Sequence, residues 1–312
     1  MSQFVTLIEA PNSATKAFHK TTYPALDPKR PELSLKGKTI VITGGGTGIG
    51  AASAEYFAKA GASLIAILGR REQPLLETKA HIESLHPETS VLALAVDATD
   101  KAAVDAAFQD IAAASSSSTI DVLVANAAVL GPLAPIADAD ATAWLKGVTT
   151  NLGINLSVTS AFLAHGRPDG IIIETSSNAS HMDIAPGFSA YAVAKLATAR
   201  FYQLVQFEYP QLRVYTVQPG AIKTDMAREA GYQEQNEGEA SQWLGRGTNL
   251  IANYDHVSLA ASFYVWLCSP EAEFLKGRYL WANWDVDELM SNKDKILAGE
   301  YLRVGLQGWP FE

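Results

Sequence analysis

Short apolar runs alternate with stretches of helix-forming sequence along most of the chain. Seven runs have the composition of strands: residues 38–43, 63–68, 91–96, 122–125, 170–175, 213–217 and 278–282. Most of these runs are apolar throughout and do not alternate with polar residues, which is typical of strands buried on both faces of a parallel sheet. The pattern therefore predicts a sheet that is covered on both faces.

The stretches between these runs predict helices at residues 51–60, 73–85, 101–114, 143–164, 189–209 and 257–267. Because strands and helices alternate, we expect an α/β fold. The prediction is a doubly wound parallel sheet of the Rossmann type, with three layers (α/β/α), in a single domain. In such folds a ligand binds beyond the carboxyl ends of the strands.

Three regions fall outside this alternation. Residues 1–36 contain closely spaced prolines and predict an arm on the surface of a main domain at 37–284, and residues 285–312 form a C-terminal extension. The polar region 224–253 is long enough for a lid over a ligand. Its apolar side chains either face that ligand or pack onto the core; they are Met226, Tyr232, Trp243 and Leu244.

Composition excludes several classes of partner. The formal net charge is −9 and no stretch is strongly basic, which argues against nucleic acid. No run approaches the roughly 18 apolar residues that cross a bilayer, and the N-terminus lacks a basic leader, so we expect a cytoplasmic protein without membrane contact. The single cysteine, Cys268, follows an apolar run and is expected to be a buried thiol.

The first strand breaks into glycines at the start of the next helix. Gly44, Gly48 and Gly50 form the pattern G-x-x-x-G-x-G. The first turn of a helix attracts phosphate through its unpaired N–H groups and its partial positive charge, and glycine lets the backbone approach the ligand. Ala51 and Ala52 follow where a P-loop would have Lys and Ser or Thr. The turn therefore indicates a nucleotide site that is not a P-loop.

Two arginines follow the second strand, where dinucleotide-binding folds distinguish between cofactors. Arg70 lies 20 residues beyond Gly50 and precedes Arg71 and Glu72. A guanidinium presents a planar fork of donors that suits a phosphate dianion, whereas an acid suits a ribose diol. The pair favours NADP(H) over NAD(H). Glu72 keeps the acidic alternative open, and two solvated arginines before a helix are a third interpretation.

Tyr191 and Lys195 are four positions apart in the predicted helix and so share one face of it. A cation beside a phenol favours the phenolate, which would make Tyr191 a usable general acid or base. Ser177 follows the fifth strand, where its hydroxyl could bind a substrate carbonyl. The alternatives are an ordinary helix surface for the pair and a turn for the serine. His181 has no companion at metal-ligand spacing, so no metal site is predicted.

Together these motifs resemble the short-chain dehydrogenase/reductase family, from about Lys38 to Ala282. The matching segments are Thr43-Gly44-x-x-x-Gly48-Ile49-Gly50, Asp97, Asn126-Ala127-Ala128, Asn151, Ser177, Tyr191, Lys195 and Pro219-Gly220-Ala221-Ile222-Lys223-Thr224. The resemblance implies cofactor contacts at Thr43, Gly44, Gly46, Thr47, Gly48, Ile49, Gly50, Arg70, Arg71, Asp97, Ala98, Asn126, Ala127, Tyr191, Lys195, Pro219, Gly220, Ile222 and Thr224.

The resemblance also implies a catalytic set. Ser177 would steady the substrate oxygen and Tyr191 would exchange its proton. Lys195 would hold the ribose and tune Tyr191, and Asn151 would order a water for the lysine. Ser177 precedes Tyr191 by 14 positions, one more than is usual in the family, so Ser176 is a lesser candidate.

Two further departures from the family pattern stand out. Ala125 and Ala128 replace an Asn and a Gly, which should alter packing at the strand end more than the chemistry. Ala282-Asn283-Trp284-Asp285 replaces a C-terminal glycine pair. With the arm and the C-terminal extension, this segment resembles a fungal branch of the family, many of whose members lack assigned substrates.

The implied function is an NADP(H)-dependent oxidoreductase. It would transfer hydride between the nicotinamide and a carbonyl or secondary alcohol of a medium or large apolar metabolite. Two alternatives stay open: a non-redox step such as elimination, epimerisation or cyclisation, and a cofactor-binding scaffold, against which the intact Ser177, Tyr191 and Lys195 count. Helix 189–209 is apolar almost all round, which suggests a partner subunit in a homodimer or homotetramer.

Overall fold

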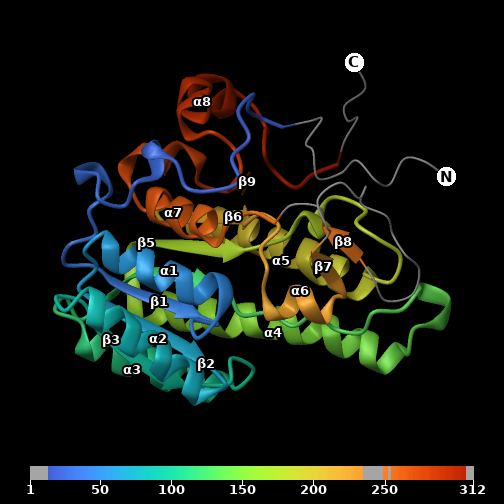
Figure 1. Ribbon diagram of the computed structural model, residues 1–312, viewed down its shortest axis with the longest axis horizontal. Helices are drawn as coiled ribbons and strands as arrows, with labels where there is room; N and C mark the ends of the chain where they lie inside the picture. Colours follow the sequence, from blue (N-terminus) through green and yellow to red (C-terminus); the bar gives the residue numbers. More distant parts are fainter. Residues whose placement is uncertain (1–12, 235–248, 252–253, 307–312) are drawn as a thin grey trace.

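The structure, a computed structural model, describes residues 13–234, 249–251 and 254–306 (Figure 1). Its centre is a seven-stranded parallel sheet in the order β3-β2-β1-β4-β5-β6-β9. The strands are β1 (Thr39–Thr43), β2 (Leu64–Gly69), β3 (Ser90–Ala95), β4 (Ile120–Ala125), β5 (Gly166–Thr175), β6 (Arg213–Gln218) and β9 (Arg278–Trp281). The predicted doubly wound fold is confirmed.

Helices cover both faces of the sheet because successive strand residues point to opposite sides and both sets are apolar. One layer holds α1 (Gly48–Lys59), α2 (Glu72–Leu85) and α7 (Val257–Leu267). The other holds α3 (Lys101–Ala114), α4 (Ala141–His165) and α5 (Ser189–Glu208). On β1, Ile40 and Ile42 pack toward the first layer and Val41 toward the second. The core is therefore two apolar layers separated by the sheet.

The strand order reverses direction between β1 and β4, and this reversal positions the site. Strand β1 has β2 on one side and β4 on the other. The loop after β1 leads toward β2 and the loop after β4 leads the opposite way, so the two loops diverge. In open α/β sheets such a switch point creates a crevice beyond the carboxyl ends of the strands. The glycine-rich turn follows β1 and therefore lies at this crevice.

Element boundaries differ from the sequence predictions at a few places. Helix α1 begins at Gly48, three residues before the predicted start, with Thr47 as the N-cap and Gly48 at φ +53°. Strand β5 begins at Gly166, and its register with β4 shifts between Ile120 and Val122. The polar region after β6 contains α6 (Asp225–Glu229) and a parallel pair, β7 (Tyr232–Glu234) with β8 (Asn249–Ile251).

The predicted lid at 224–253 falls partly outside the described residues. Residues 235–248 and 252–253, with Trp243 and Leu244, are among those not described. Within the described part of the chain, no helix is both long and apolar enough to cross a membrane.

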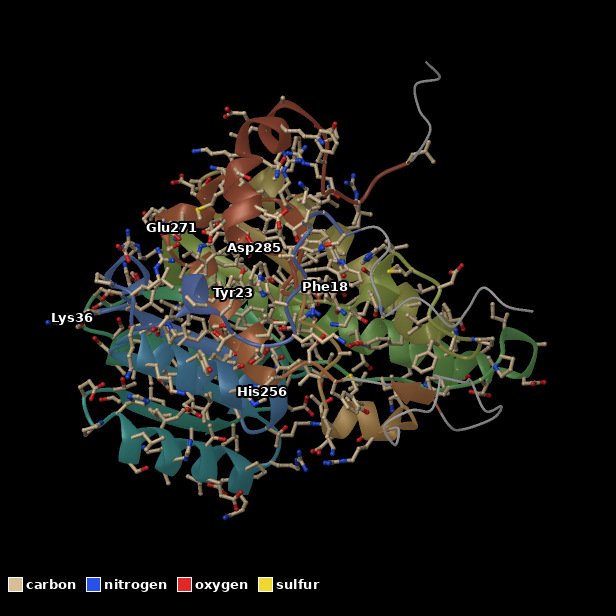
Figure 2. The ribbon with its side chains drawn as sticks, turned by 45° about the horizontal axis from the view of Figure 1, so that its top comes forward. Phe18, Tyr23, Lys36, His256, Glu271 and Asp285 are labelled. Carbon is tan, nitrogen blue, oxygen red and sulfur yellow. The ribbon has the colours of Figure 1, made fainter. Side chains whose placement is uncertain are left out.

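The N-terminal arm, from residue 13 to residue 36, packs against the end of the chain (Figure 2). Its short 3₁₀ turns η1 (Pro24–Leu26) and η2 (Pro31–Leu33) bury Leu26 and Leu33 in the core layer of α1 and α7. Earlier in the arm, Phe18 forms an antiparallel β-bridge with Trp284, and the backbone N–H of His19 donates to the Asn283 carbonyl at 2.8 Å. The arm is therefore part of the packed structure.

The chain beyond β9 completes this contact. It contains α8 (Val286–Ser291) and α9 (Lys293–Ala298). The 3₁₀ turn η5 (Pro270–Leu275) comes just before β9. The Glu288 carboxylate accepts the backbone N–H groups of Lys16 and Ala17 at 2.8 and 2.9 Å. The Tyr23 hydroxyl donates to the Trp284 carbonyl and accepts the N–H of Val286. The arm and the segment after β9 are thereby held together beside the sheet.

Candidate active site

A cavity of about 990 Å³ lies beyond the carboxyl ends of the strands and contains nearly all the predicted site residues. Those lining it are Thr43, Gly44, Gly46, Thr47, Gly48, Ile49, Arg70, Arg71, Asp97, Ala98, Asn126, Ala127, Ser176, Ser177, Tyr191, Lys195, Pro219, Gly220, Ile222 and Thr224. Gly50 and Asn151 are buried behind the wall. The fold therefore gathers residues from six loops and from helix α5 into one pocket.

The glycine turn has the geometry of an anion cradle. Gly44 has φ +68°, and a Cβ there would lie 2.8 Å from Asn126 Nδ2. A Cβ on Gly50 would overlap the carbonyl of Gly44, so Gly50 lets α1 pack against the turn, and its contact with a cofactor stays a prediction. Thr47 makes no side-chain cap to α1, which leaves the first N–H groups of the helix available to a phosphate. These features fit a pyrophosphate.

Thr43 and Asn126 join the ends of β1 and β4 at the floor of the pocket. The Thr43 hydroxyl accepts the backbone N–H groups of Asn126 and Ala127, each at 3.0 Å. Asn126 Nδ2 donates in return to the Thr43 carbonyl at 2.9 Å. The cofactor turn and the loop after β4 are thereby held at a constant separation.

The rim of the pocket carries opposite charges. Arg70 and Arg71 are exposed, and Arg71 Nη2 lies 3.6 Å from Asp225 Oδ2 at the start of α6. Asp97 accepts the N–H and hydroxyl of Thr99 at 2.9 and 2.8 Å. These hydrogen bonds, together with the Arg70 charge, lower the pKa of the Asp97 carboxyl. A phosphate at this rim would face two guanidiniums.

The hydroxyl, phenol and amine predicted for catalysis line the same pocket. Ser177 is half-buried at the end of β5, begins the 3₁₀ turn η4 (Asn178–Ser180), and its Oγ accepts the N–H of Ala179 at 3.2 Å. Ser176 is buried, and its hydroxyl interacts with the side chains of Glu174 and Tyr279. Tyr191 and Lys195 lie one turn apart on α5.

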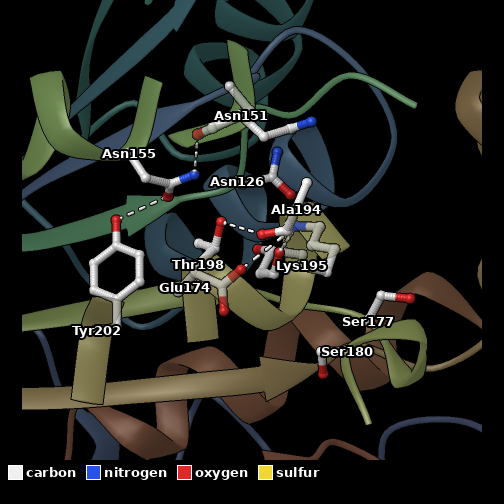
Figure 3. A network of polar contacts seen from close by, with 12 residues as sticks. Asn126, Asn151, Asn155, Glu174, Ser177, Ser180, Ala194, Lys195, Thr198 and Tyr202 are labelled. Carbon is white, nitrogen blue, oxygen red and sulfur yellow. Dashed lines mark hydrogen bonds and ion pairs between the residues drawn. The ribbon is translucent and has the colours of Figure 1, made fainter. Parts of the chain in front are cut away.

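Lys195 is 5% exposed and is held from below by β5 (Figure 3). Its Nζ donates to the Thr175 carbonyl at 2.5 Å and to Glu174 Oε1 at 3.4 Å. Burial raises the pKa of the Glu174 carboxyl, against the opposing charge of Lys195. The sequence analysis did not identify Glu174, because a single acid in an apolar strand has no motif around it.

Asn151 does not line the pocket; its side chain is buried against the loop after β4. Its Oδ1 accepts the N–H of Val129 at 3.0 Å, and its Nδ2 donates to the carbonyls of Val129 and Gly147, each at 2.9 Å. Its own carbonyl accepts Asn155 Nδ2 at 2.8 Å (Figure 3). The side chain thus holds the loop after β4. The role of Asn151 in ordering a water stays a prediction, for which the carbonyl has a second lone pair.

Comparison with known proteins adds to this geometry. The family described as "short chain dehydrogenase" matches residues 38–235. A "Short chain dehydrogenase/reductase" of Claviceps purpurea is 33% identical over 297 residues, which cover 94% of each chain. The chain belongs to the short-chain dehydrogenase/reductase family. Because the fungal relative matches over nearly the whole length, the similarity includes segments outside residues 38–235.

Solved short-chain dehydrogenases share the fold. A short chain dehydrogenase from Burkholderia cenocepacia in complex with NADP is 24% identical, with a TM-score of 0.66, and the match covers 81% of this chain and 99% of that one. A 7α-hydroxysteroid dehydrogenase complexed with NADH and 7-oxo glycochenodeoxycholic acid is 22% identical, with a TM-score of 0.65, covering 84% and 97%. This protein is therefore an oxidoreductase of a family that uses nicotinamide cofactors.

The apolar wall of the pocket comes mostly from residues that the sequence analysis did not assign to the site. It includes Leu130, Met182, Ile184, Phe188 and Trp281, and also Phe18 of the arm. Trp281 ends β9 directly before the unusual Ala-Asn-Trp-Asp segment, which was the available signal. Nothing in the local sequence around Phe18 indicates that it reaches a site more than a hundred residues away in the chain.

Proposed function

We propose that this short-chain dehydrogenase/reductase transfers hydride between NADP(H) and a carbonyl or secondary alcohol of a medium or large apolar metabolite. The observation that carries the proposal is that Ser177, Tyr191 and Lys195 line the same pocket as the glycine turn. A pyrophosphate on the turn would place the nicotinamide end of the cofactor near Tyr191 and the segment from Pro219 to Thr224. When bound, the nicotinamide supplies or accepts the hydride at its C4.

Each of the three residues has a role that its position supports. Ser177 would donate its hydroxyl to the substrate oxygen, since it faces the pocket at the end of β5. Tyr191 would give its phenolic proton to that oxygen during reduction and take it back during oxidation. Lys195 would hold the ribose and, as a cation, favour the phenolate form of Tyr191. The protein thus supplies placement and charge stabilisation.

The preference for NADP(H) rests on the two arginines at the rim. Arg70 and Arg71 line the pocket on the side of α2, where the adenosine end of a cofactor on the glycine turn would lie. Guanidiniums bind a 2′-phosphate through paired charge-assisted hydrogen bonds. Family membership alone does not decide this, because solved members hold either NADP or NADH.

The apolar wall supports a substrate larger than a simple ketone. The pocket extends past the glycine turn to Leu130, Phe188 and Trp281, which give it an apolar wall. One relative of the same fold binds a bile-acid ketone. A polycyclic or long apolar metabolite would fill this space and exclude water from the reacting atoms.

We also propose a homodimer or homotetramer in the cytosol. The lone cysteine, Cys268, is buried, and burial raises the pKa of its thiol to about 12, so it is inert and suits a reducing compartment. The outer faces of α4 and α5 carry exposed apolar side chains: Leu145, Leu156, Val193, Leu196, Leu204 and Phe207. A contiguous apolar face on two neighbouring helices is typical of a subunit interface.

The proposal is tested by mixing the full chain with NADPH and a panel of ketones and quinones and following the absorbance of the reduced nicotinamide. Tyr191→Phe should keep the NADPH affinity within a few-fold and lower turnover by a factor of at least about 100, because the proton donor is lost. Tyr209→Phe, at the far end of the same helix and outside the pocket, is the matched control.

Unchanged turnover in Tyr191→Phe would refute this tyrosine as the proton carrier. Tight NADPH binding without oxidation across the panel would instead favour a non-redox step on the same fold. Failure to bind either nicotinamide cofactor would contradict the proposal as a whole.

A further inference from the structure

Glu174 places a carboxyl group beneath the proposed catalytic lysine. It lies on β5, is 1% exposed, and its Oε1 is 3.4 Å from Lys195 Nζ. Its second oxygen, Oε2, is buried, and the Ser176 hydroxyl interacts with this carboxyl. A buried acid is costly even with a neutral partner, so its position calls for an explanation in terms of its neighbours.

The donors of Lys195 explain what the acid does. An ammonium has three N–H donors. One points to the Thr175 carbonyl at 2.5 Å and a second to Glu174, which is buried behind the pocket wall. Since Lys195 also lines the cavity, its third donor remains for a ligand there. Glu174 and the Thr175 carbonyl therefore fix the ammonium in place and leave one N–H for a cofactor hydroxyl.

The other groups around this pair do not compete for its charge. Four phenols lie near it: Tyr191 and Tyr202 on α5, Tyr264 on α7 and Tyr279 on β9. Burial raises the pKa of Tyr202, Tyr264 and Tyr279, so these three stay neutral. Helix α4 contributes uncharged residues, Asn151, Asn155 and Thr159. The charge on Lys195 is thus opposed by Glu174 on one side and open to Tyr191 on the other.

We propose that Glu174 is a positioning residue for the reaction: its carboxylate holds the Lys195 ammonium and keeps it charged beside Tyr191. This inference rests on the proposed function. With the carboxylate present, the pair is neutral overall and buried. Without it, a buried ammonium has no counter-charge and gives up its proton more readily.

The pH dependence follows with a definite sign. Replacing Glu174 by glutamine adds one net positive charge to the group formed by Lys195 and Tyr191. The first proton lost from this coupled group then leaves at lower pH, whether it comes from the amine or the phenol. Carbonyl reduction needs both the protonated Lys195 amine and the protonated Tyr191 phenol. The alkaline limb of its pH profile should therefore move to lower pH.

The first experiment measures turnover against pH for the wild type, Glu174→Gln and Glu174→Asp with the best substrate of the panel. Glu174→Gln should move the alkaline limb of kcat to lower pH by about one unit, which is typical of losing a nearby charge. Glu174→Asp restores the charge and should return the limb toward the wild-type position at a reduced kcat. The NADPH affinity should change by only a few-fold.

Thr198→Val is the matched control. Thr198 is buried on α5 one turn beyond the Lys195 site, and its hydroxyl donates to the Ala194 carbonyl without touching Lys195 (Figure 3). This variant should keep the wild-type pH profile. If Glu174→Gln also keeps the wild-type limb and kcat, Glu174 has no positioning role and the inference is wrong.

A second experiment does not depend on activity. Urea unfolding at neutral pH is compared for Glu174→Gln, Lys195→Met and the double variant. Each single variant leaves one buried charge unpaired, whereas the double variant removes both charges. The double variant should therefore unfold at a higher urea concentration than additive effects of the single variants predict. Additive effects would overturn the inference, and a wild type without nicotinamide-dependent turnover would count against the proposed function instead.

Discussion

The proposed preference for NADP(H) depends on Arg70 and Arg71. Both are exposed at the rim, and only Arg71 has a described ion pair, with Asp225 of α6 at 3.6 Å. Arg70 lies near Asp97, whose carboxyl its charge helps to keep ionised. A 2′-phosphate would therefore draw on Arg70 first, since Arg71 is shared with the segment after β6. Glu72, the first residue of α2, is exposed and leaves the acidic alternative testable.

Arg70→Ala should weaken NADPH far more than NADH. A charge-assisted hydrogen bond contributes roughly 1.5–3 kcal/mol, so kcat/KM for NADPH should fall about 10- to 100-fold while the value for NADH changes by less than about threefold. Steady-state kinetics with both cofactors measures the ratio. Lys79→Ala, a cation further along α2, is the control. Equal losses for the two cofactors would show that Arg70 does not read the 2′-phosphate.

Ser176 and Ser177 illustrate how neighbouring hydroxyls acquire different surroundings. Successive residues at the end of a strand face opposite ways. Ser177 is half-buried and engages the N–H of Ala179, whereas Ser176 is 3% exposed. The more open hydroxyl, Ser177, is therefore the better candidate for contact with substrate, although its spacing to Tyr191 is one position longer than the family usually has.

At the scale of elements, α5 has one face that lines the pocket and another that is exposed and apolar. One face carries Tyr191 and Lys195 into the pocket. The outer face carries apolar residues that the monomer leaves exposed, such as Leu196 and Phe207 at 43% and 81%. The start of the helix is tied to α4, because Trp144 Nε1 donates to Ser189 Oγ at 2.9 Å. Any partner docking on this face would thus be coupled to the placement of the phenol.

The arm is the second element that matters for the site. It runs beside the segment after β9, where His19 Nε2 lies 2.8 Å from Asp285 Oδ2 and the rings of His19 and Tyr23 stack with centroids 3.6 Å apart (Figure 2). These contacts hold Phe18 against the pocket, where its backbone pairs with Trp284. The arm therefore forms part of the wall that a substrate would meet.

Phe18→Ala should raise KM for a bulky apolar substrate about tenfold and leave the NADPH affinity unchanged. Truncating the ring removes apolar contact worth roughly 1.5–3 kcal/mol when fully buried, and Phe18 is half-buried. Kinetics with a large and a small ketone shows whether KM rises only for the large substrate or for both. Lys36→Ala, at an exposed position of the arm, is the control (Figure 2). If Phe18→Ala and Lys36→Ala have the same KM for the large ketone, Phe18 does not contact the substrate.

At the scale of the whole molecule, the apolar faces of α4 and α5 remain after the core is complete. Phe207 is the most exposed of their side chains, while comparable aromatic residues such as Phe162 and Tyr202 are fully buried. A large exposed apolar surface is unfavourable in water unless something covers it. A second copy of the chain, bringing the same two helices, would do so symmetrically.

The double variant Leu196→Glu with Phe207→Glu should dissociate the oligomer into monomers. Two carboxylates facing the same two in the partner would be desolvated and would repel each other. Light scattering after size-exclusion chromatography measures the mass. Leu297→Glu, an exposed apolar residue on α9, should leave the assembly intact. A wild type that is already monomeric would contradict the proposed interface.

Local information in the sequence determined the fold class and the places of the glycine turn and of the Tyr191–Lys195 pair. Burial on both faces makes each strand continuously apolar, glycine is required where φ is +68° at Gly44, and helical periodicity places residues four apart on one face. Most strand ends differ from the prediction by one or two residues, and the largest difference is at Gly166, where pairing with β4 extends β5.

Only the tertiary structure decided which distant residues meet at the site. Phe18, Glu174 and Trp281 reach the pocket or the residues that line it from the arm, β5 and β9, because the sheet order and the docking of the arm bring these elements together. Asn151 proved to lie behind the wall, since its amide pairs with Val129. Contacts between residues so far apart in the chain arise from packing, and packing leaves no periodic trace in the sequence.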